Sequence, residues 1–411
     1  MGGAGRYVVR GGGAARIVIK GAAAGAAPPT MTRMGRPFDV CIRGAGIVGR
    51  ALALQLAARR LRVALVEAPG TAAASGHSDV RAYALNGASR ELLQGLRCWP
   101  DPMHATPVLS MQVRGDAGGA LQFDAAEQAA EALNWIVDVP TLEGLLAQAV
   151  GFQSLIEVRD TPVPAALTVV CEGKASSTRA AYGVDFDSHA YPQWALAARV
   201  RCEQPHAQIA RQWFATADGD PEILAFLPLD GPQGSSCALV WSLAPGRAQA
   251  LQAESEEEFC AALLAASQSS LGPLALISER AVWPLVSATA RQWFGVHADG
   301  AWALAGDAAH AVHPLAGQGL NLGLGDVACL SALLEAKPYW RSVGDARLLQ
   351  TYTRERKSAV AMVGGAGDAL QNLFSQSHPA IQAARNWGLT AFSHSGPLKH
   401  WIARRAMGLR A

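Results

Sequence analysis

The sequence predicts an α/β fold in which a parallel-sheet domain is interleaved with a mostly antiparallel β-sheet domain and followed by a helical C-terminal tail. Three observations indicate this fold. An apolar strand, a glycine pattern, a helix and a second strand follow one another from residue 38. A second glycine-rich strand and helix lie about 260 residues later, and strand-like runs without intervening helices fill much of the segment between them.

Length and composition favour a folded protein of about two domains. The 411 residues include 35 Lys and Arg against 33 Asp and Glu, so no basic excess predicts a nucleic-acid partner. The seven cysteines are scattered and never form a C-x-x-C pair, which favours reduced cytosolic thiols. No uninterrupted apolar run is long enough to cross a bilayer.

The N-terminal segment, residues 1–36, is rich in Gly and Ala and contains no Asp or Glu. Such a composition cannot build a hydrophobic core. A targeting peptide is the weaker interpretation, because the segment is poor in Ser and shows no amphipathic stripe. We therefore expect a disordered tail or a mis-assigned start.

The first glycine pattern follows an apolar strand. Gly44, Gly46 and Gly49 form a G-x-G-x-x-G turn that opens a helix, and a second strand, Val63–Val66, ends at Glu67. In this context the glycines allow the turn, the approach of a pyrophosphate and close helix packing, while the acidic residue binds ribose hydroxyls. The pattern predicts a Rossmann-like dinucleotide site.

The second glycine-rich stretch, Ala301–Asp326, begins as an apolar strand, breaks at Gly306 and Asp307, and re-enters a helix among further glycines. We expect the Asp307 carboxylate to accept hydrogen bonds from the hydroxyls of a polyol chain. Free N–H groups from Gly317 to Asn321 would stabilise negative charge on a planar ring. These properties match a flavin. A tight strand–helix connection in which Asp307 only caps the helix is the alternative.

Both stretches resemble the fingerprints of the FAD-dependent hydroxylases of ubiquinone biosynthesis, within the aromatic-ring hydroxylase flavin monooxygenases. The resemblance rests on GDAAH and GQGLNLG in the second stretch, on D-x-R-x-x-A-L around Arg81, and on the C-terminal elements at Arg385, Gly388-Leu389, Pro397-Leu398-Lys399 and Ala406-Met407-Gly408. It implies FAD as the cofactor, with Arg81 lying against it. The expected cofactor-binding residues are Gly44, Gly46, Gly49, Glu67, Arg81, Gly306, Asp307, Pro314, Gly317, Gln318, Gly319, Leu320 and Asn321.

Two positions depart from the family pattern. Arg43 stands directly before the first glycine, where an apolar residue or Gly is more usual, and Glu172-Gly173 replaces an Asp-Gly motif associated with FAD and nicotinamide contacts. The carboxylate is retained on a side chain one methylene longer. The reductant is therefore left open between NADH or NADPH and an electron-carrier protein.

The pattern of elements divides the chain into discontinuous domains. We assign residues 37–107, 141–185 and 278–345 to the FAD-binding domain, 108–140 and 186–277 to the substrate domain, and 346–411 to a C-terminal helical region. Five aromatic residues of the substrate domain either line an aromatic-substrate pocket or, as we expect, form its core. They are Trp194, Trp213, Phe214, Phe226 and Trp241.

The resemblance implies an FAD-dependent monooxygenase that hydroxylates the ring of a polyprenylated phenol or quinol with O₂. In this family reduced FAD forms a C4a-hydroperoxide, which survives only where water is excluded. No catalytic base can be named, and Pro314 and Gln318 are the candidates to lie against the ring face. His310 and His313 are three residues apart, but no third ligand lies nearby, so we expect no metal.

Two alternatives stay open. The protein could be a hydroxylase of a soluble aromatic compound or another flavoprotein of the same fold, or it could be an FAD-bound non-catalytic scaffold of a biosynthetic complex. A lipid-tailed substrate implies contact with a membrane surface or a biosynthetic complex, for which the amphipathic C-terminal region is the candidate. We expect a cytoplasmic protein, with peripheral attachment at the inner face of the membrane as the alternative.

Overall fold

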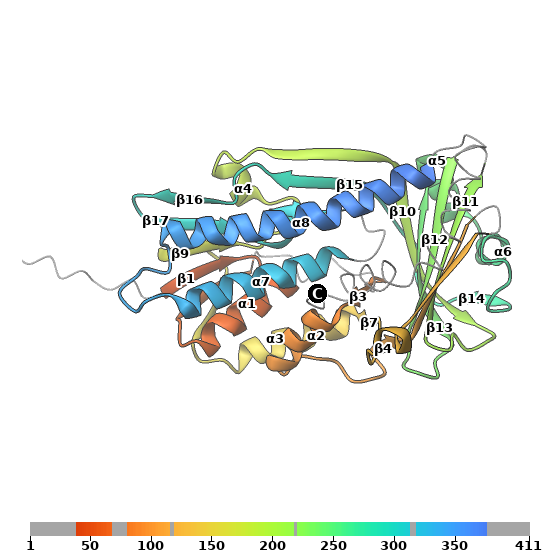
Figure 1. The fold of residues 1–411 in the computed structure, drawn as a ribbon, viewed down its shortest axis with the longest axis horizontal. Helices are drawn as coiled ribbons and strands as arrows, with labels where there is room; N and C mark the ends of the chain where they lie inside the picture. Colours follow the sequence, from red (N-terminus) through yellow and green to blue (C-terminus); the bar gives the residue numbers. More distant parts are fainter. Residues whose placement is uncertain (1–37, 68–79, 116–118, 218–219, 313–317, 376–411) are drawn as a thin grey trace, which may run out of the picture. The chain divides into compact units, whose positions relative to one another are not determined.

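A six-stranded sheet forms the first half of the structure (Figure 1). The structure is a computed structural model that describes residues 38–67, 80–115, 119–217, 220–312 and 318–375. In the last helix it describes side chains as far as residue 365. The strands of the six-stranded sheet in spatial order are β16 (Phe294–His297), β17 (Gly300–Leu304), β9 (Ala165–Val170), β1 (Phe38–Arg43), β2 (Val63–Val66) and β8 (Ile156–Arg159). All neighbours are parallel except β16 and β17. The near-continuous apolar runs of β2 and β9 fit a parallel sheet covered on both faces.

Helices α1 (Ile47–Ala58), α3 (Val139–Gly151) and α7 (Gln318–Ala336) cover one face of this sheet, and Figure 1 shows them side by side. Their apolar residues share one core with alternate residues of β1, β2, β9 and β17. The long helix α8 (Ala346–Ser375) packs on α7. By length and composition α7 is apolar enough to cross a membrane, although Asn321 and Asp326 interrupt its apolar run, and more than half of that stretch is buried inside the protein. It packs as a core helix.

A nine-stranded, mostly antiparallel sheet forms the second half. Its spatial order is β18 (His310–Ala311), β15 (Ala281–Ala290), β10 (Phe186–Cys202), β13 (Ser236–Leu243), β12 (Asp220–Pro228), β11 (Ile209–Ala217), β5 (Ser110–Arg114) and β6 (Ala120–Asp124), with β14 (Leu274–Leu276) paired to β10. One face packs against α5 (Pro245–Ala253) and α6 (Glu256–Ala266). A capping box between Ser255 and Glu258 starts α6.

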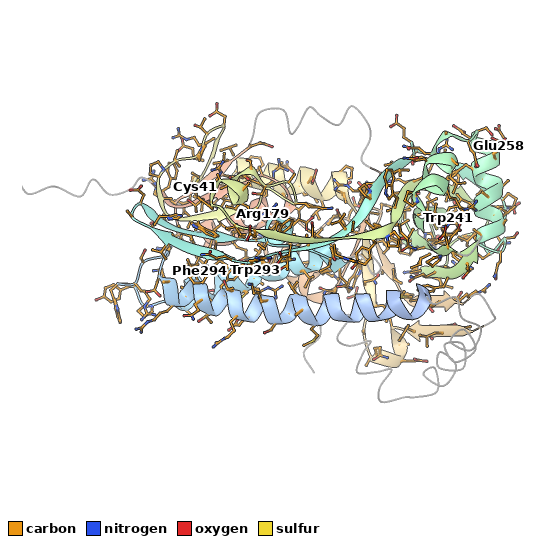
Figure 2. The ribbon with its side chains drawn as sticks, turned by 90° about the horizontal axis from the view of Figure 1, so that it is seen from above. Cys41, Arg179, Trp241, Glu258, Trp293 and Phe294 are labelled. Carbon is orange, nitrogen blue, oxygen red and sulfur yellow. The ribbon has the colours of Figure 1, made fainter. Side chains whose placement is uncertain are left out.

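Four of the five aromatic residues assigned to the core of the substrate domain lie there, as expected, whereas Phe214 is only half-buried and belongs to the opposite face by strand alternation. Trp213, Phe226 and Trp241 are buried in the cluster between the sheet and the two helices, and Trp194 packs against that cluster. Figure 2 shows Trp241 on this side of the sheet, with Glu258 on α6 beyond it. Strand alternation therefore turns these rings away from the opposite face.

A three-stranded sheet of β3 (Ala82–Leu85), β7 (Asn134–Asp138) and β4 (Ala105–Val108) lies beside the other two. The remaining elements are α2 (Gly87–Gly95), α4 (Ser177–Ala181) and the short 3₁₀ turns η1 (Ala126–Gln128) and η2 (Gly306–Ala308). β3 pairs with β7, so this sheet crosses the domain boundary that the sequence analysis put at residue 107.

The predicted return to the FAD-binding domain at residue 278 is wrong. β15 pairs with β10 over most of its length and therefore belongs to the nine-stranded sheet. The six-stranded sheet resumes only at β16. The apolar pattern of β15 fits either sheet, and only its pairing partner, about 90 residues earlier in the chain, decides between them.

Candidate active site

The candidate site lies along the carboxyl edge of the six-stranded sheet. Because β17, β9, β1 and β2 are parallel neighbours, the residues that follow them meet at one edge. Gly44 follows β1, Glu67 follows β2 and Asp307 follows β17. Glu67 and Asp307 are three strand spacings apart, about 14 Å along the edge. An extended dinucleotide can lie across it.

The three glycines of the first turn do three different things. Gly44 has φ +106°, and a Cβ there would lie 2.4 Å from the Cys171 carbonyl oxygen. A Cβ on Gly49 would lie 1.9 Å from the Gly44 oxygen, so this position lets α1 pack on the turn. A Cβ on Gly46 would meet nothing within 4 Å. Open space therefore lies beside the free N–H groups at the start of α1, where a pyrophosphate fits.

The acidic residue at the end of β2 is held in place by α1. The Arg50 Nη2 atom lies 3.0 Å from the Glu67 Oε1 atom. This ion pair ties the carboxylate to the helix that follows the glycine turn. It fixes Glu67 at the place where the dinucleotide ribose is expected.

Asp307 faces a cavity of about 770 Å³, which Arg81 and Lys174 also line. The side chain is exposed to the cavity, yet the surrounding protein removes enough water that burial raises the pKa of Asp307 above its ordinary value. The charges of His310, Lys174 and Arg81 oppose that rise in pKa. The carboxylate is thus set in a partly dry, positively charged surrounding, suited to accept hydrogen bonds from ligand hydroxyls.

The two glycine-rich turns touch through one side chain of α1. A Cβ on Gly306, which has φ +61°, would lie 3.3 Å from Val48 Cγ2, and a Cβ on Gly323 would lie 2.7 Å from the same atom. Val48 therefore packs between η2 and the first turns of α7. Glycine at both positions lets the second turn approach the first.

The start of α7 brings Gln318, Gly319 and Leu320 to the cavity. The first N–H groups of a helix have no acceptor within it and can stabilise negative charge on a ligand. The Asn321 side chain, in contrast, forms hydrogen bonds with other parts of the protein. Its Oδ1 accepts hydrogen bonds from the Asn86 N–H (3.0 Å) and the Ser89 hydroxyl (2.7 Å), and its Nδ2 donates to the Ala84 carbonyl (2.8 Å). This amide holds α7 to β3 and α2, so only the Asn321 backbone remains for a cofactor.

Several residues of the predicted site lie outside the described residues. These are Asp79 of the D-x-R pattern, His313, Pro314 and Gly317 of the second stretch, and the C-terminal family elements from Arg385 onward. Their assignments stay predictions.

The two departures from the family pattern contact one another. Arg43 Nε lies 3.0 Å from Glu172 Oε1. Glu172 also accepts hydrogen bonds from the Ser176 hydroxyl (2.7 Å) and the Thr178 N–H (3.0 Å) at the start of α4. Burial alone would raise the pKa of Glu172, but the hydrogen bonds from Thr178 and Ser176 and the Arg43 charge outweigh it and lower the pKa. The longer carboxylate thus caps α4 and neutralises the additional arginine.

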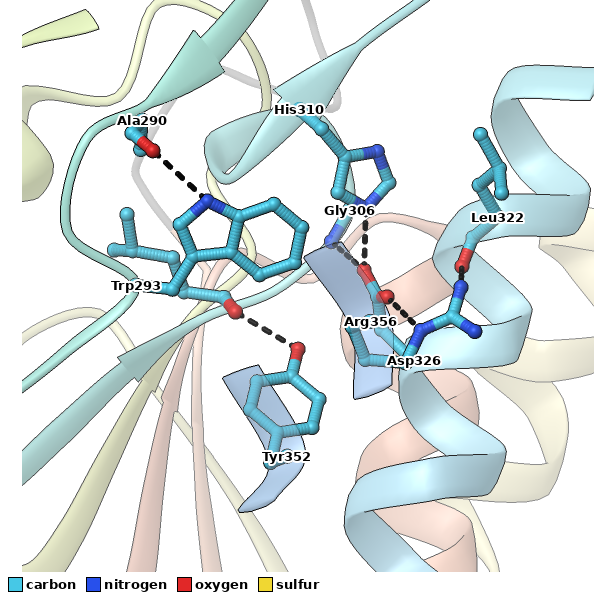
Figure 3. Close-up of polar contacts among 9 residues, drawn as sticks. Ala290, Trp293, Gly306, His310, Leu322, Asp326, Tyr352 and Arg356 are labelled. Atoms are coloured by element: carbon cyan, nitrogen blue, oxygen red, sulfur yellow. Dashed lines mark hydrogen bonds and ion pairs between the residues drawn. The ribbon is translucent and has the colours of Figure 1, made fainter. Parts of the chain in front are cut away.

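A buried carboxylate that the sequence analysis missed supports the second turn (Figure 3). Asp326 of α7 is fully buried and accepts hydrogen bonds from the Gly306 N–H (2.8 Å) and His310 Nε2 (2.7 Å). Arg356 Nε of α8 donates to its other oxygen at 2.7 Å. A charged residue in the otherwise apolar run of α7 is the pattern that could have revealed it.

This network also accounts for His310. Its ring stacks on Trp293 with centroids 5.2 Å apart while Nε2 bonds to Asp326. Within the part of the chain that the structure describes, no three His, Cys, Asp or Glu side chains are grouped to hold a metal ion. His310 is thus a structural partner of the carboxylate beneath the turn.

Comparison with known proteins places this geometry among FAD enzymes. Residues 145–364 match the family described as FAD binding domain, and residues 39–138 match FAD dependent oxidoreductase. The structure of PqsL, a probable FAD-dependent monooxygenase from Pseudomonas aeruginosa, has a TM-score of 0.69 at 21% identity and covers 86% of this chain and 99% of its own. For p-nitrophenol 4-monooxygenase PnpA from Pseudomonas putida DLL-E4 the TM-score is 0.68 at 18% identity, with 91% and 99% covered. These structures share the fold, that of FAD-dependent monooxygenases.

Two relatives indicate the family of FAD-dependent monooxygenases to which the chain belongs. The 3-demethoxyubiquinol 3-hydroxylase of Escherichia coli (strain K12) is 30% identical over 400 residues, which cover 91% of this chain and 99% of that protein. The ubiquinone hydroxylase UbiL of Rhodospirillum rubrum is 30% identical over 418 residues, 94% of each chain. The chain therefore belongs to the family of FAD-dependent hydroxylases of ubiquinone biosynthesis. FAD is its cofactor, and it is an aromatic-ring monooxygenase.

The glycine turn predicts a matched set of variants. Gly46→Ala should lose bound FAD, because its methyl group occupies only the cofactor's space, while its apoprotein should melt at the same temperature as the wild-type apoprotein. Gly49→Ala should lose about 1–3 kcal/mol of stability, because its methyl group overlaps the Gly44 carbonyl. Gly144→Ala, on an exposed face of α3, is the control: it should leave flavin content unchanged and raise stability by about 0.5–1 kcal/mol, because alanine favours a helix interior. Thermal unfolding and visible flavin absorbance measure both effects. Full flavin content in Gly46→Ala would contradict this site.

Replacing Asp307 with Asn should weaken FAD binding about 10-fold to 100-fold, since hydrogen bonds to a charged acceptor are worth about 1.5–3 kcal/mol. Because burial raises the pKa of Asp307, the carboxylate should become protonated at a pH above the usual aspartate range. Protonation removes its ability to accept hydrogen bonds from the ribityl hydroxyls. Wild-type affinity should therefore fall on acidification, and the Asn variant should bind weakly with a flatter pH dependence. Flavin fluorescence titrations from pH 4 to 8 measure this, at about one-unit steps. Parallel pH curves for the two proteins would refute the assignment.

Asp326→Asn should destabilise the protein by about 3–5 kcal/mol at neutral pH, because it leaves Arg356 buried without its partner. Burial alone would raise the pKa of Asp326, but His310 and Arg356 lower it below its ordinary value. The contribution of Asp326 to folding stability is thus present above its pKa in the unfolded chain, about 3.9. It is lost as the pH falls through the lower pKa of the folded protein. The gap between wild type and variant in urea unfolding should shrink below about pH 4. The exposed Asp160→Asn is the control, and a gap independent of pH would contradict the network.

Proposed function

We propose that this enzyme hydroxylates the ring of an uncharged, lipid-tailed phenol or quinol on the route to ubiquinone. One observation carries the proposal. Among the described residues that the nine-stranded sheet contributes to the lining of the cavity, the side chains are apolar apart from Gln212, Ser242 and Arg211. A substrate wall of this kind favours a neutral, apolar ligand.

The arginines near this face are engaged elsewhere. Arg211 is next to Gln212 but belongs to the opposite face by strand alternation, and its guanidinium donates to the His206 (3.2 Å) and Ile209 (3.4 Å) carbonyls. Arg199 pairs with Asp138 at 2.5 Å. A hydroxylase of a soluble aromatic acid would need a cation for the substrate carboxylate on this wall. Among the described residues, the other two cations that line the cavity, Arg81 and Lys174, come from outside the nine-stranded sheet, which favours the lipid-tailed substrate.

Room for an apolar tail comes from the neighbouring strands. Met111 of β5, Phe123 of β6 and Ile136 of β7 line the cavity together with Leu133. The relatives support the same substrate class, since one is named for 3-demethoxyubiquinol and another for ubiquinone. A substrate of this kind resides in a membrane, so we also propose peripheral contact of the protein with a membrane surface or a lipid-presenting complex.

In the reaction, the protein binds and orients FAD and the substrate and keeps water away from the reacting ring. Gly46 and the start of α1 receive the pyrophosphate, Glu67 the ribose, and Asp307 the ribityl chain. The start of α7 directs N–H groups at the flavin ring, which supplies the oxygen-activating chemistry when bound and reduced. The apolar sheet covers the reacting ring and excludes water.

Purified, FAD-loaded protein tests the proposal. With NADH, NADPH or a reduced carrier protein it should consume O₂ and hydroxylate a short-chain prenylated phenol, with higher kcat/KM than for 4-hydroxybenzoate. It should also restore ubiquinone synthesis in one of a set of bacterial strains that each lack a single ring hydroxylation. Preference for the soluble acid would support the alternative hydroxylase. Bound FAD with no product from any phenol and no complementation would support a non-catalytic scaffold.

A further inference from the structure

Gln212 is an unusual residue on the substrate wall. It lies on β11 opposite Ala225 of β12 and Val113 of β5, in the middle of the sheet. Its side chain is on the same face as Ala210 and borders the cavity. Only 7% of the residue is exposed, so its amide is held within the protein at the surface of this cavity.

The Gln212 amide has no hydrogen-bonding partner within the part of the chain that the structure describes. No side-chain hydrogen bond to it occurs among the described residues, although an amide carries two donors and two acceptor lone pairs. Neither atom of the amide is among the fully buried side-chain atoms that lack a partner, so the amide reaches the cavity, where water or a ligand can pair with it. An apolar residue would satisfy the packing here at lower cost. The amide is therefore positioned for a ligand.

Another buried glutamine of the same sheet shows the contrast. Gln193 of β10 is also nearly inaccessible, but its Nε2 donates to the Pro221 carbonyl at 2.7 Å and joins two strands. Gln193 thus has a structural partner. Ser242, the other polar residue of the wall, lies two strands away on β13, opposite Ile223. Gln212 and Ser242 therefore mark two separate positions on the wall.

We propose that Gln212 is a specificity-determining residue whose amide hydrogen-bonds an oxygen substituent of the substrate ring. An amide can donate to a methoxy or carbonyl oxygen and accept from a hydroxyl, so it suits a neutral ring that carries such groups. Because Ser242, the other uncharged polar residue of the wall, lies two strands away, the contact with Gln212 sets the rotation of the ring in its plane. It thereby selects which ring carbon meets the flavin. This inference rests on the proposed function.

Substitution of Gln212 tests the role. Gln212→Leu should lower kcat/KM for an oxygen-substituted prenylated phenol about 10-fold to 100-fold, the loss of one or two hydrogen bonds. For an analogue in which hydrogen replaces that oxygen substituent, wild type and variant should differ less than about 2-fold. Misorientation should also raise the hydrogen peroxide released per reductant consumed and shift the hydroxylated position. FAD affinity should not change.

Matched variants separate this role from packing. Gln212→Met keeps the volume without an amide and should behave like the Leu variant, whereas Gln212→Asn should retain part of the discrimination. Gln122→Met, at an exposed glutamine of β6 outside the cavity lining, should leave the product position unchanged. Melting temperature and flavin content establish that each variant is folded. Equal loss of kcat/KM on both substrates, or wild-type regioselectivity in the folded Leu and Met variants, would overturn the proposal. A wild-type enzyme that hydroxylates no prenylated phenol would instead refute the proposed function.

Discussion

The structure depends on one buried carboxylate. Asp326 accepts hydrogen bonds from the turn that carries Asp307, from His310 and from Arg356 of α8. A charge without exposure to water is tolerated only when it is paired and hydrogen-bonded on all sides, so these three partners cannot move independently. The turn at Gly306 and Asp307, the helix α7 and the long C-terminal helix α8 are thereby held in one arrangement. Gly325 permits this contact, because a Cβ there would lie 2.8 Å from the Arg356 guanidinium.

The cofactor site combines this fixed turn with a second one that is more than 250 residues away in the chain. Val48 of α1 packs against Gly306 and Gly323, so the ends proposed for the pyrophosphate and for the ribityl chain share a single apolar contact. Parallel pairing of β17, β9, β1 and β2 supplies the common edge. The nine-stranded sheet then closes the cavity with an apolar face, which provides a dry setting for oxygen transfer.

Departures from the family pattern need not indicate lost function. Arg43 and Glu172 each break the pattern alone, yet in the fold they form an ion pair, and Glu172 also caps α4. These contacts engage the Glu172 carboxylate with other residues of the protein. The altered motif therefore has a structural explanation and does not by itself support a non-catalytic scaffold.

The sequence by itself determined the α/β fold, both glycine turns and the acidic residues that follow β2 and β17. These depend on backbone conformations and spacings that are local, where a glycine or a strand end can be recognised from its neighbours. Only the tertiary structure decided the sheet to which β15 belongs, the pairing of Arg43 with Glu172, the clamp by Asn321 and the buried Asp326. Each of these is a contact between elements distant in the chain, and residue type alone does not specify the partner. The same holds for Gln212, whose amide faces the cavity because strand pairing, not local pattern, sets the face on which it lies.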